Sequence, residues 1–259
     1  MLLAGLLTLN AVPAAPPETT ARDELRAAEL MTAALFARDA GKEEMRKMEF
    51  IYAELTAKYP RDAAVKNACG EFLWSVGEPA RAVEAWLAAE EIDPKSAVVL
   101  DHLGGSFLAA GNPKKAAGYY ARATASAPDN ATYHYNYANV AFLFRHELLD
   151  AARPDAAAML HDALSHFAAA TRLDPLNAEY ARAYAETFYS VPNPDWRAAL
   201  LAWQHFYEIT PGKDFALLNL ARVHMTLGNK PEARASLARI QSPEFDRLKT
   251  RLLERIETE

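Results

Sequence analysis

Apolar residues recur at helical spacing along this chain, in short runs that Gly and Pro interrupt. The first run, about 21–40, ends at Gly41, and the second, 43–58, ends just before Pro60. In the next two pairs of runs, a Gly follows the first run and a Pro opens the second, at Gly77-Glu78-Pro79 and Gly111-Asn112-Pro113. This is the order in which these residues end and begin helices. The pattern therefore predicts an all-α chain built of helix pairs.

The second and third helix pairs repeat each other at a spacing of 34 residues. The matched positions are Gly70, Leu73, Gly77, Pro79, Ala82, Trp86, Ala89 and Pro94, then Gly104, Phe107, Gly111, Pro113, Ala116, Tyr120, Ala123 and Pro128. A fixed period of this length is typical of one supersecondary unit stacked on copies of itself. We therefore expect the pairs to form one continuous array.

The matched residues resemble the tetratricopeptide repeat, over about Glu29 to Phe245. The resemblance implies a right-handed α-α superhelical solenoid of about six helix pairs with a C-terminal capping helix. By this register the solenoid spans 21–259, and 243–259 form the capping helix. The predicted units are about 21–60, 61–94, 95–128, 129–175, 176–211 and 212–242.

The fourth unit contains 13 residues more than the period. Ala163, Phe167, Ala170 and Pro175 keep their mutual spacing, so the extra residues lie between the two helices of the unit, at about 144–159. Apolar residues continue through this insertion, and Pro154-Asp155 suits a helix start. We therefore expect a lengthened helical hairpin that protrudes from one edge of the array.

The formal charge of −6 argues against a nucleic-acid partner, which requires a basic face for phosphates. Residues 1–14 are apolar, end in small residues and resemble a signal peptide, with 15–20 as a linker. This predicts a periplasmic or secreted protein; because no Lys or Arg precedes the apolar run, a cytoplasmic protein with an uncleaved segment is the alternative. No other apolar run approaches the ~20 residues of a spanning helix, so we expect no transmembrane segment in the mature chain.

The sequence contains no constellation typical of catalysis. Its seven histidines are scattered, and none lies in a His-Glu-x-x-His motif. His161 and His166 are five residues apart, which places them on diverging sides of a helix and argues against a metal pair. Cys69, the single cysteine, is expected to be a small buried hydrophobe. We therefore predict no enzyme activity, no cofactor and no metal site.

The resemblance also implies a binding surface, because tetratricopeptide repeats line a concave groove with the first helix of each pair. Carried over by register, the groove residues are Asn67, Glu71, Trp74, Asp101, Leu108, Tyr135, Asn139, Phe142, Arg182, Glu186, Tyr189, Arg222 and Met225. Aromatic rings with Asn and Arg among them suit a bound peptide, and an ordinary solvated face is the alternative. Some family members bind a C-terminal carboxylate through Lys and Asn of neighbouring first helices, and at the corresponding positions of this chain Glu71 and Asp101 would repel it.

These observations predict a non-catalytic adaptor that binds an unidentified protein or peptide segment in its groove, in the bacterial cell envelope. One alternative is a spacer whose hairpin at 144–160 binds the partner. A more remote alternative is a hydrolase that uses the groove as its active site. The adaptor is preferred because the sequence supplies repeats and aromatic groove positions but no activated nucleophile.

Overall fold

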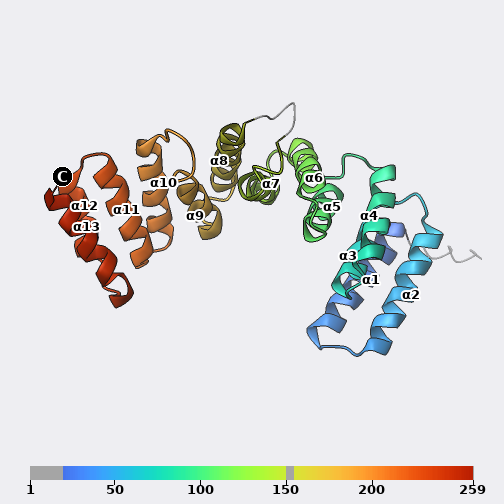
Figure 1. Ribbon diagram of the computed structural model, residues 1–259. Coiled ribbons are helices and arrows are strands. Elements are labelled where there is room, and N and C mark those ends of the chain that lie inside the picture. The colour runs from blue at the N-terminus through green and yellow to red at the C-terminus, as the bar shows by residue number, and fades with distance from the viewer. Residues whose placement is uncertain (1–19, 150–154, 259) are drawn as a thin grey trace, which may run out of the picture. The chain divides into compact units, whose positions relative to one another are not determined.

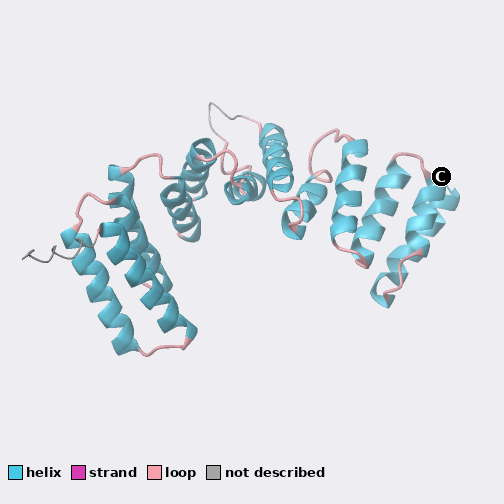
Figure 2. Cartoon of the chain, turned by 180° about the vertical axis from the view of Figure 1, so that it is seen from behind, coloured by secondary structure: helices cyan, strands magenta, loops and turns pink. Residues whose placement is uncertain are grey.

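The computed structural model describes residues 20–149 and 155–258, which fold into helices joined by turns, without a β-strand (Figures 1 and 2). The all-α prediction is therefore confirmed for this part of the chain. The described residues divide into two compact units, unit 1 up to Ile92 and unit 2 from Asp93 onward. The predicted signal peptide, 1–14, lies outside the described residues, as does nearly all of the predicted linker.

Unit 1 consists of two helix pairs, in which each helix packs against the next along the chain. Its helices are α1 (Ala21–Ala37), α2 (Lys42–Lys58), α3 (Ala63–Ser75) and α4 (Pro79–Ile92). Polar side chains begin two of them: Thr20 and Asp23 form a reciprocal capping box at α1, and Asp62 accepts hydrogen bonds from two backbone N–H groups of α3. These contacts satisfy N–H groups that the first turn of a helix leaves without partners.

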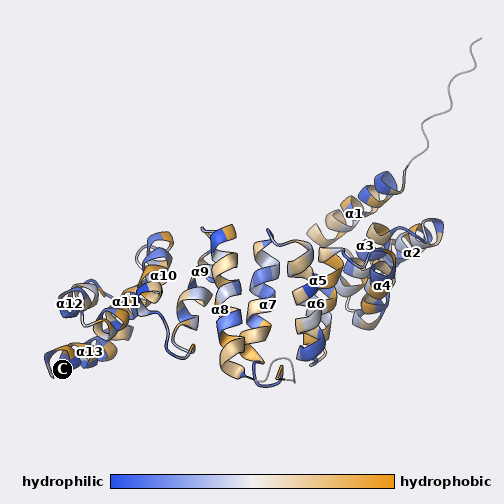
Figure 3. Ribbon diagram, turned by 90° about the horizontal axis from the view of Figure 1, so that it is seen from above, coloured by the Kyte–Doolittle hydropathy of each residue, from blue (hydrophilic) through white to orange (hydrophobic). Residues whose placement is uncertain are grey.

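Unit 2 continues the same order with four helix pairs and a last helix, α13, that packs against α12 and α11. Its elements are α5 (Ala97–Ala109), α6 (Pro113–Ser126), α7 (Ala131–Leu143), α8 (Ala156–Leu173), α9 (Ala178–Thr187), α10 (Trp196–Ile209), α11 (Asp214–Thr226), α12 (Lys230–Ala238), the 3₁₀ turn η1 (Pro243–Phe245) and α13 (Asp246–Thr258). Figure 3 shows hydrophobic and hydrophilic residues on the same helices, as expected for helices with one packed face.

A contact between a small and a large residue holds the two matched pairs together. A Cβ atom added to Gly70 would lie 2.5 Å from Nε1 of Trp86, and one added to Gly104 would lie 2.7 Å from Cδ1 of Tyr120. Only glycine therefore lets the aromatic ring of the second helix approach the first helix so closely. The alanine of the period is fully buried wherever it recurs, at Ala82, Ala116, Ala163, Ala199 and Ala233.

The insertion differs from the helical hairpin that the sequence predicts. Helix α8 is 18 residues long, four more than the 14 residues of α6, so part of the insertion does extend a helix. Residues 144–148, however, form a turn and residue 149 is irregular, so the prediction of helix there is wrong. Leu148 is only 3% exposed and packs in the same cluster as Met159, because burying this apolar side chain favours a turn that folds back. Residues 150–154, in the middle of the insertion, lie outside the described residues.

The last helix packs as a cap, although less completely than its apolar pattern predicts. Leu252 and Ile256 of α13 are 9% and 2% exposed and belong to the same core cluster as α11 and α12 residues. Leu248, one helical turn before Leu252 on the same side of α13, is 41% exposed. The buried contacts of α13 are therefore concentrated in its second half.

Candidate functional site

Ten of the 13 predicted groove residues lie in unit 2, on or just after the first helix of each pair. We call this set the unit 2 row: Asp101 and Leu108 of α5, Tyr135, Asn139 and Phe142 of α7, Arg182, Glu186 and Tyr189 of α9 and its following turn, and Arg222 and Met225 of α11. All ten are exposed or partly exposed. The row is therefore a surface that a ligand can reach.

Helices α5 and α7 are joined across the row by one polar contact. Nδ2 of Asn136 donates a hydrogen bond to Oδ1 of Asp101 over 2.8 Å. Burial raises the pKa of Asp101, and the hydrogen bond from Asn136 opposes that shift. One carboxylate oxygen of Asp101 thus has a partner on the neighbouring helix.

Helices α7 and α9 are joined in the same way by Tyr135. Its hydroxyl donates to Oε1 of Glu179 over 2.6 Å, and its ring centroid lies 4.7 Å from that of Tyr180. Burial and this bond to Glu179 both raise the pKa of Tyr135, so its hydroxyl remains a neutral donor. A second contact, 3.1 Å between the hydroxyls of Thr132 and Tyr180, supports the same junction.

Helix α11 meets the turn after α9 through Asn219. The backbone carbonyl oxygen of Asn219 accepts a hydrogen bond from the Tyr189 hydroxyl, and its side-chain Oδ1 accepts one from Nη1 of Arg222, each over 3.4 Å. The Arg222 guanidinium also lies 4.9 Å from the centroid of the Tyr189 ring, a cation–π distance. Burial raises the pKa of Tyr189 to about 12, against the opposing charge of Arg222. Asn219 is only 2% exposed, so the Tyr189 hydroxyl and the Arg222 guanidinium both bind a residue that is buried beneath the surface.

Three residues of the row line a pocket of about 440 Å³ at this end of unit 2. Its walls are Tyr189, Trp196, Arg222, Met225, Thr226, Leu252 and Arg255. The register of first helices predicts Tyr189, Arg222 and Met225 but misses Trp196 and Arg255. Those two belong to a second helix, α10, and to the cap helix α13, which the repeat pattern does not assign to the groove.

The remaining predicted groove residues, Asn67, Glu71 and Trp74, lie on α3 in unit 1. Nδ2 of Asn67 donates to Oε1 of Glu71 over 2.8 Å, a bond within one helix. Trp74 is 42% exposed, and its ring centroid lies 5.8 Å from that of Trp86. The structure therefore brings the ten unit 2 residues onto one compact unit and leaves these three in the other.

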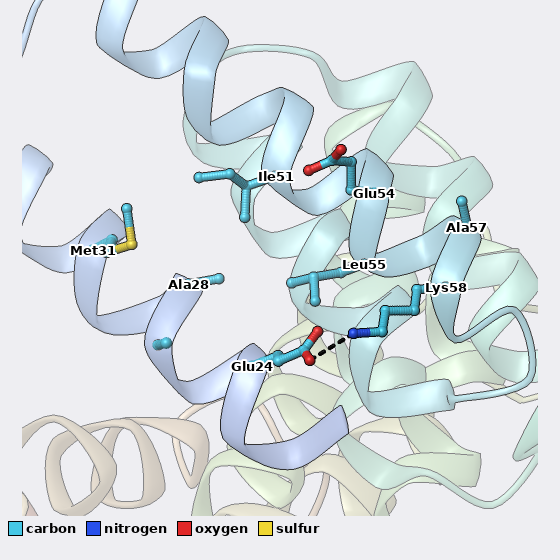
Figure 4. A pocket seen from close by; sticks show the side chains of 9 residues that line it. Glu24, Ala28, Met31, Ile51, Glu54, Leu55, Ala57 and Lys58 are labelled. Carbon is cyan, nitrogen blue, oxygen red and sulfur yellow. Dashed lines mark hydrogen bonds and ion pairs between the residues drawn. The ribbon is translucent and has the colours of Figure 1, made fainter. Parts of the chain in front are cut away.

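Unit 1 contains a pocket of a different kind, of about 710 Å³, between α1 and α2. Figure 4 shows Ala28 and Met31 on α1 across from Ile51 and Leu55 on α2. At one end Nζ of Lys58 lies 2.7 Å from Oε1 of Glu24. The pocket thus offers apolar area, and its charged groups at that end already pair with each other.

Two histidines from different helices meet in unit 2, a pairing that the sequence spacing does not reveal. Nδ1 of His134 on α7 lies 2.9 Å from Nδ1 of His166 on α8, and Nε2 of His134 lies 2.9 Å from the Pro128 carbonyl oxygen. Oδ1 of Asp162 is 3.8 Å from Nε2 of His166. Within the described residues, no three or more His, Cys, Asp or Glu side chains are grouped so that they could hold a metal ion.

Comparison with protein families gives one match, which covers residues 103–161 and is described as Tetratricopeptide repeat. Comparison with curated proteins gives no match. Among the helices that the structure describes, none has the length and apolar character needed to cross a membrane.

Solved structures of similar fold cover most of the chain. The YrrB protein matches with a TM-score of 0.61 at 18% identity, over 80% of this chain and 97% of that one. PilF of Pseudomonas aeruginosa matches with a TM-score of 0.59 at 16% identity, over 88% and 93%. MamA of Desulfovibrio magneticus matches with a TM-score of 0.51 at 16% identity, over 73% and 94%. The family match and the fold both confirm the resemblance that the sequence predicts.

Proposed function

We propose that this tetratricopeptide repeat protein is a non-catalytic scaffold that binds an extended segment of a partner protein along the unit 2 row. Stacked repeats of this kind present extended surfaces that serve for binding. YrrB is a tetratricopeptide repeat protein with an unusual peptide-binding site, so peptide binding has a precedent on this fold. We further propose that the protein acts in the cell envelope after removal of residues 1–14.

The observation that carries the proposal is the series of contacts between successive first helices. Hydrogen bonds join α5 to α7 through Asp101 and Asn136, and α7 to α9 through Tyr135 and Glu179. Tyr189 and Asn219 join the turn after α9 to α11. A surface whose helices are already fixed loses less conformational entropy when a ligand binds. Both apolar and polar groups remain accessible to a peptide on this surface. Arg182 and Glu186 are exposed, and Tyr135 and Asn139 are partly exposed.

Peptide display on the immobilised full chain tests this function. Enriched peptides would be labelled and their affinities compared between the wild type and the double variant Tyr135→Ala with Arg182→Glu. We expect the double variant to lose roughly tenfold or more in affinity, because it removes an anchoring ring and reverses a charge. Arg182→Glu alone, at an exposed position, serves where the double variant lowers stability.

The matched control is Leu201→Ala with Arg172→Glu, which makes the same change of charge at exposed positions of α10 and α8. It should retain wild-type affinity. Equal loss in both double variants, or no enriched peptide, would contradict binding along the row. Envelope location is tested separately by mass spectrometry of the chain from fractionated cells, where we expect a mature chain that begins at Ala15.

A further inference from the structure

The pocket at the C-terminal end of the row combines positive charge with aromatic and aliphatic side chains, and most of its accessible surface is polar. Arg222 and Arg255 are the charged residues of its lining, and none of the seven lining residues is acidic. The chain as a whole has a formal charge of −6, so this local balance is opposite in sign to that of the whole molecule. A partly enclosed pocket lined by one sign of charge concentrates ligands of the opposite sign.

Within the part of the chain that the structure describes, Arg222 forms no ion pair. Its contacts there are the Asn219 side-chain oxygen and the Tyr189 ring, both uncharged. A guanidinium presents several N–H donors in a planar fork, which matches the two oxygens of a carboxylate. Arg222 is exposed, so an arriving carboxylate can reach these donors without first displacing an internal partner.

Apolar groups lie beside the guanidinium. The rings of Tyr189 and Trp196 lie 5.7 Å apart, centroid to centroid, and Met225 and Leu252 complete the apolar lining. Tyr189 also contacts Trp203, which is fully buried, so its ring rests on the core of unit 2. These rings and aliphatic groups can contact an apolar side chain next to the carboxylate, while the polar part of the lining faces the carboxylate itself.

We propose that this pocket binds a carboxylate of the partner peptide, with Arg222 contacting the carboxylate and the Tyr189–Trp196 walls contacting an adjacent apolar side chain. The proposal rests on the peptide-binding function proposed above and assigns one end of the peptide to one place on the row. The acidic residues Glu71 and Asp101 that argue against a carboxylate in the first repeats are not among the pocket residues.

Two pairs of short peptides test the proposal and distinguish the two sources of a carboxylate. The first pair is acetyl-Gly-Ser-Phe as the free acid and as its C-terminal amide. The second is acetyl-Gly-Ser-Phe-Glu-Ser-amide and the same peptide with Gln in place of Glu. Each is titrated into the full ¹⁵N-labelled chain while the indole N–H signal of Trp196, assigned with Trp196→Phe, is followed by NMR.

We expect an acid of at least one pair to shift the Trp196 signal at concentrations roughly tenfold lower than its neutral counterpart. Preference for the free acid of the first pair identifies a chain terminus, and preference for Glu in the second identifies a side chain. Arg222→Gln should remove the preference, and Arg222→Lys should restore part of it. Arg234→Gln, the same change at an exposed position of α12 outside the pocket, should leave it unchanged.

Equal binding of acid and neutral peptides, or an unchanged preference in Arg222→Gln, would overturn the carboxylate assignment. These outcomes are separable from failure of the wider function. The Tyr135 and Arg182 variants test the row with displayed peptides, whereas the short peptides probe only the pocket. Enriched peptides without an acid preference would leave the scaffold function standing and the pocket assignment wrong.

Discussion

Units 1 and 2 share the packing of their helix pairs but differ in the polar contacts between their helices. In unit 2, hydrogen bonds join successive repeats, from α5 to α7, from α7 to α9, and from the turn after α9 to α11. In unit 1, ion pairs join α2 to its neighbours, through Lys58 with Glu24 and Arg81 with Glu49. The bond between Asn67 and Glu71 stays within α3. The same repeat thus supports two different distributions of polar contacts.

The pockets of the two units also differ in the polar groups that they offer to a ligand. The pocket between α1 and α2 offers mainly apolar side chains, which supply contact area but little that orients a ligand. The pocket lined by Tyr189, Trp196 and Arg222 places donors beside aromatic rings. Directed polar groups give orientation and specificity, whereas apolar area alone does not. The comparison therefore favours unit 2 as the unit that recognises a partner.

The largest predicted effect tests the packing of a glycine against an aromatic ring, which the two units share. Gly70→Leu in unit 1 and Gly104→Leu in unit 2 would each force a side chain into a buried aromatic ring, and we expect each to cost about 3 kcal/mol in free energy of unfolding. Gly118→Leu, in α6 with open space around it, should be neutral or slightly stabilising. Urea unfolding measures the totals, and hydrogen exchange shows which unit loses protection.

The double variant Gly104→Leu with Tyr120→Ala checks the cause of this loss. If the clash with the Tyr120 ring is responsible, the two costs should be clearly less than additive, because removal of the ring makes space for the leucine. Fully additive costs, or a loss of similar size in Gly118→Leu, would show that the close approach of helix and ring is not what makes glycine necessary.

The packing of the pairs could be predicted from the sequence because it depends on local, repeated choices. Gly70 and Trp86, and Gly104 and Tyr120, occupy the same places in a 34-residue period, and each contact forms within one pair. The turn at 144–148 could not be predicted in this way. Its apolar residues fit a helical pattern, and only the tertiary environment, in which Leu148 is buried, selects a turn.

The register predicts which residues lie on first helices, but not the contacts that their side chains make. The register places Tyr135, Arg182 and Arg222 on exposed or partly exposed first-helix positions, as observed. It carries no information about which side chains reach across to a neighbouring helix, so Asn219 and Glu179 were missed. Trp196 and Arg255 were missed for a related reason, because contacts between elements far apart in the chain have no signal in the spacing of one sequence.

A predicted effect of intermediate size tests the difference between the hydrogen bonds of the two units. Tyr135→Phe removes the hydroxyl that joins α7 to α9, and we expect a loss of about 1 kcal/mol in free energy of unfolding. Asn67→Ala removes the bond within α3 of unit 1 and should change stability by less than about 0.5 kcal/mol. Oδ1 of Asn67 is buried without a hydrogen-bond partner, so removing this side chain also relieves an unfavourable burial.

Urea unfolding followed by circular dichroism measures both variants of this pair. Glu179→Gln is the matched check, because it keeps a hydrogen-bond acceptor for Tyr135 while removing the charge. It should fall between the wild type and Tyr135→Phe. Equal losses in Tyr135→Phe and Asn67→Ala would remove the distinction between bonds that join helices and bonds within one helix.

The smallest predicted effect is a pH dependence in the unit 2 pair α7–α8. Burial lowers the pKa of His166, and the nearby His134 lowers it further, whereas Asp162 on the same helix raises it. The unfolded chain therefore takes up a proton on this residue more readily than the folded chain. The stabilising contribution is fully present above pH of about 6.5 and declines as the pH falls through the lowered pKa of the folded state.

The hydrogen bonds at this site show which nitrogen of His166 takes up the proton. Nε2 of His134 faces the Pro128 carbonyl and so donates, which leaves its Nδ1 to accept from Nδ1 of His166. The added proton goes to Nε2 of His166, toward Asp162, whose other oxygen accepts from the Tyr137 hydroxyl. Burial of the His166 ring disfavours this charged form. We expect the change to be less than about 1 kcal/mol, because the His166 ring is partly exposed and solvent screens its charge.

Urea midpoints at pH 7.5, 6.5 and 5.5 measure this effect in the wild type and in His166→Gln, which should lose less stability over the range. His161→Gln, at an exposed position of the same helix, should follow the wild type. Hydrogen exchange at pH 5.5 should locate the loss at α7 and α8, with α3 and α4 of unit 1 unaffected. If His166→Gln keeps the wild-type slope, the ring contact adds nothing to the α7–α8 junction, and the difference between the units lies only in the contacts between first helices.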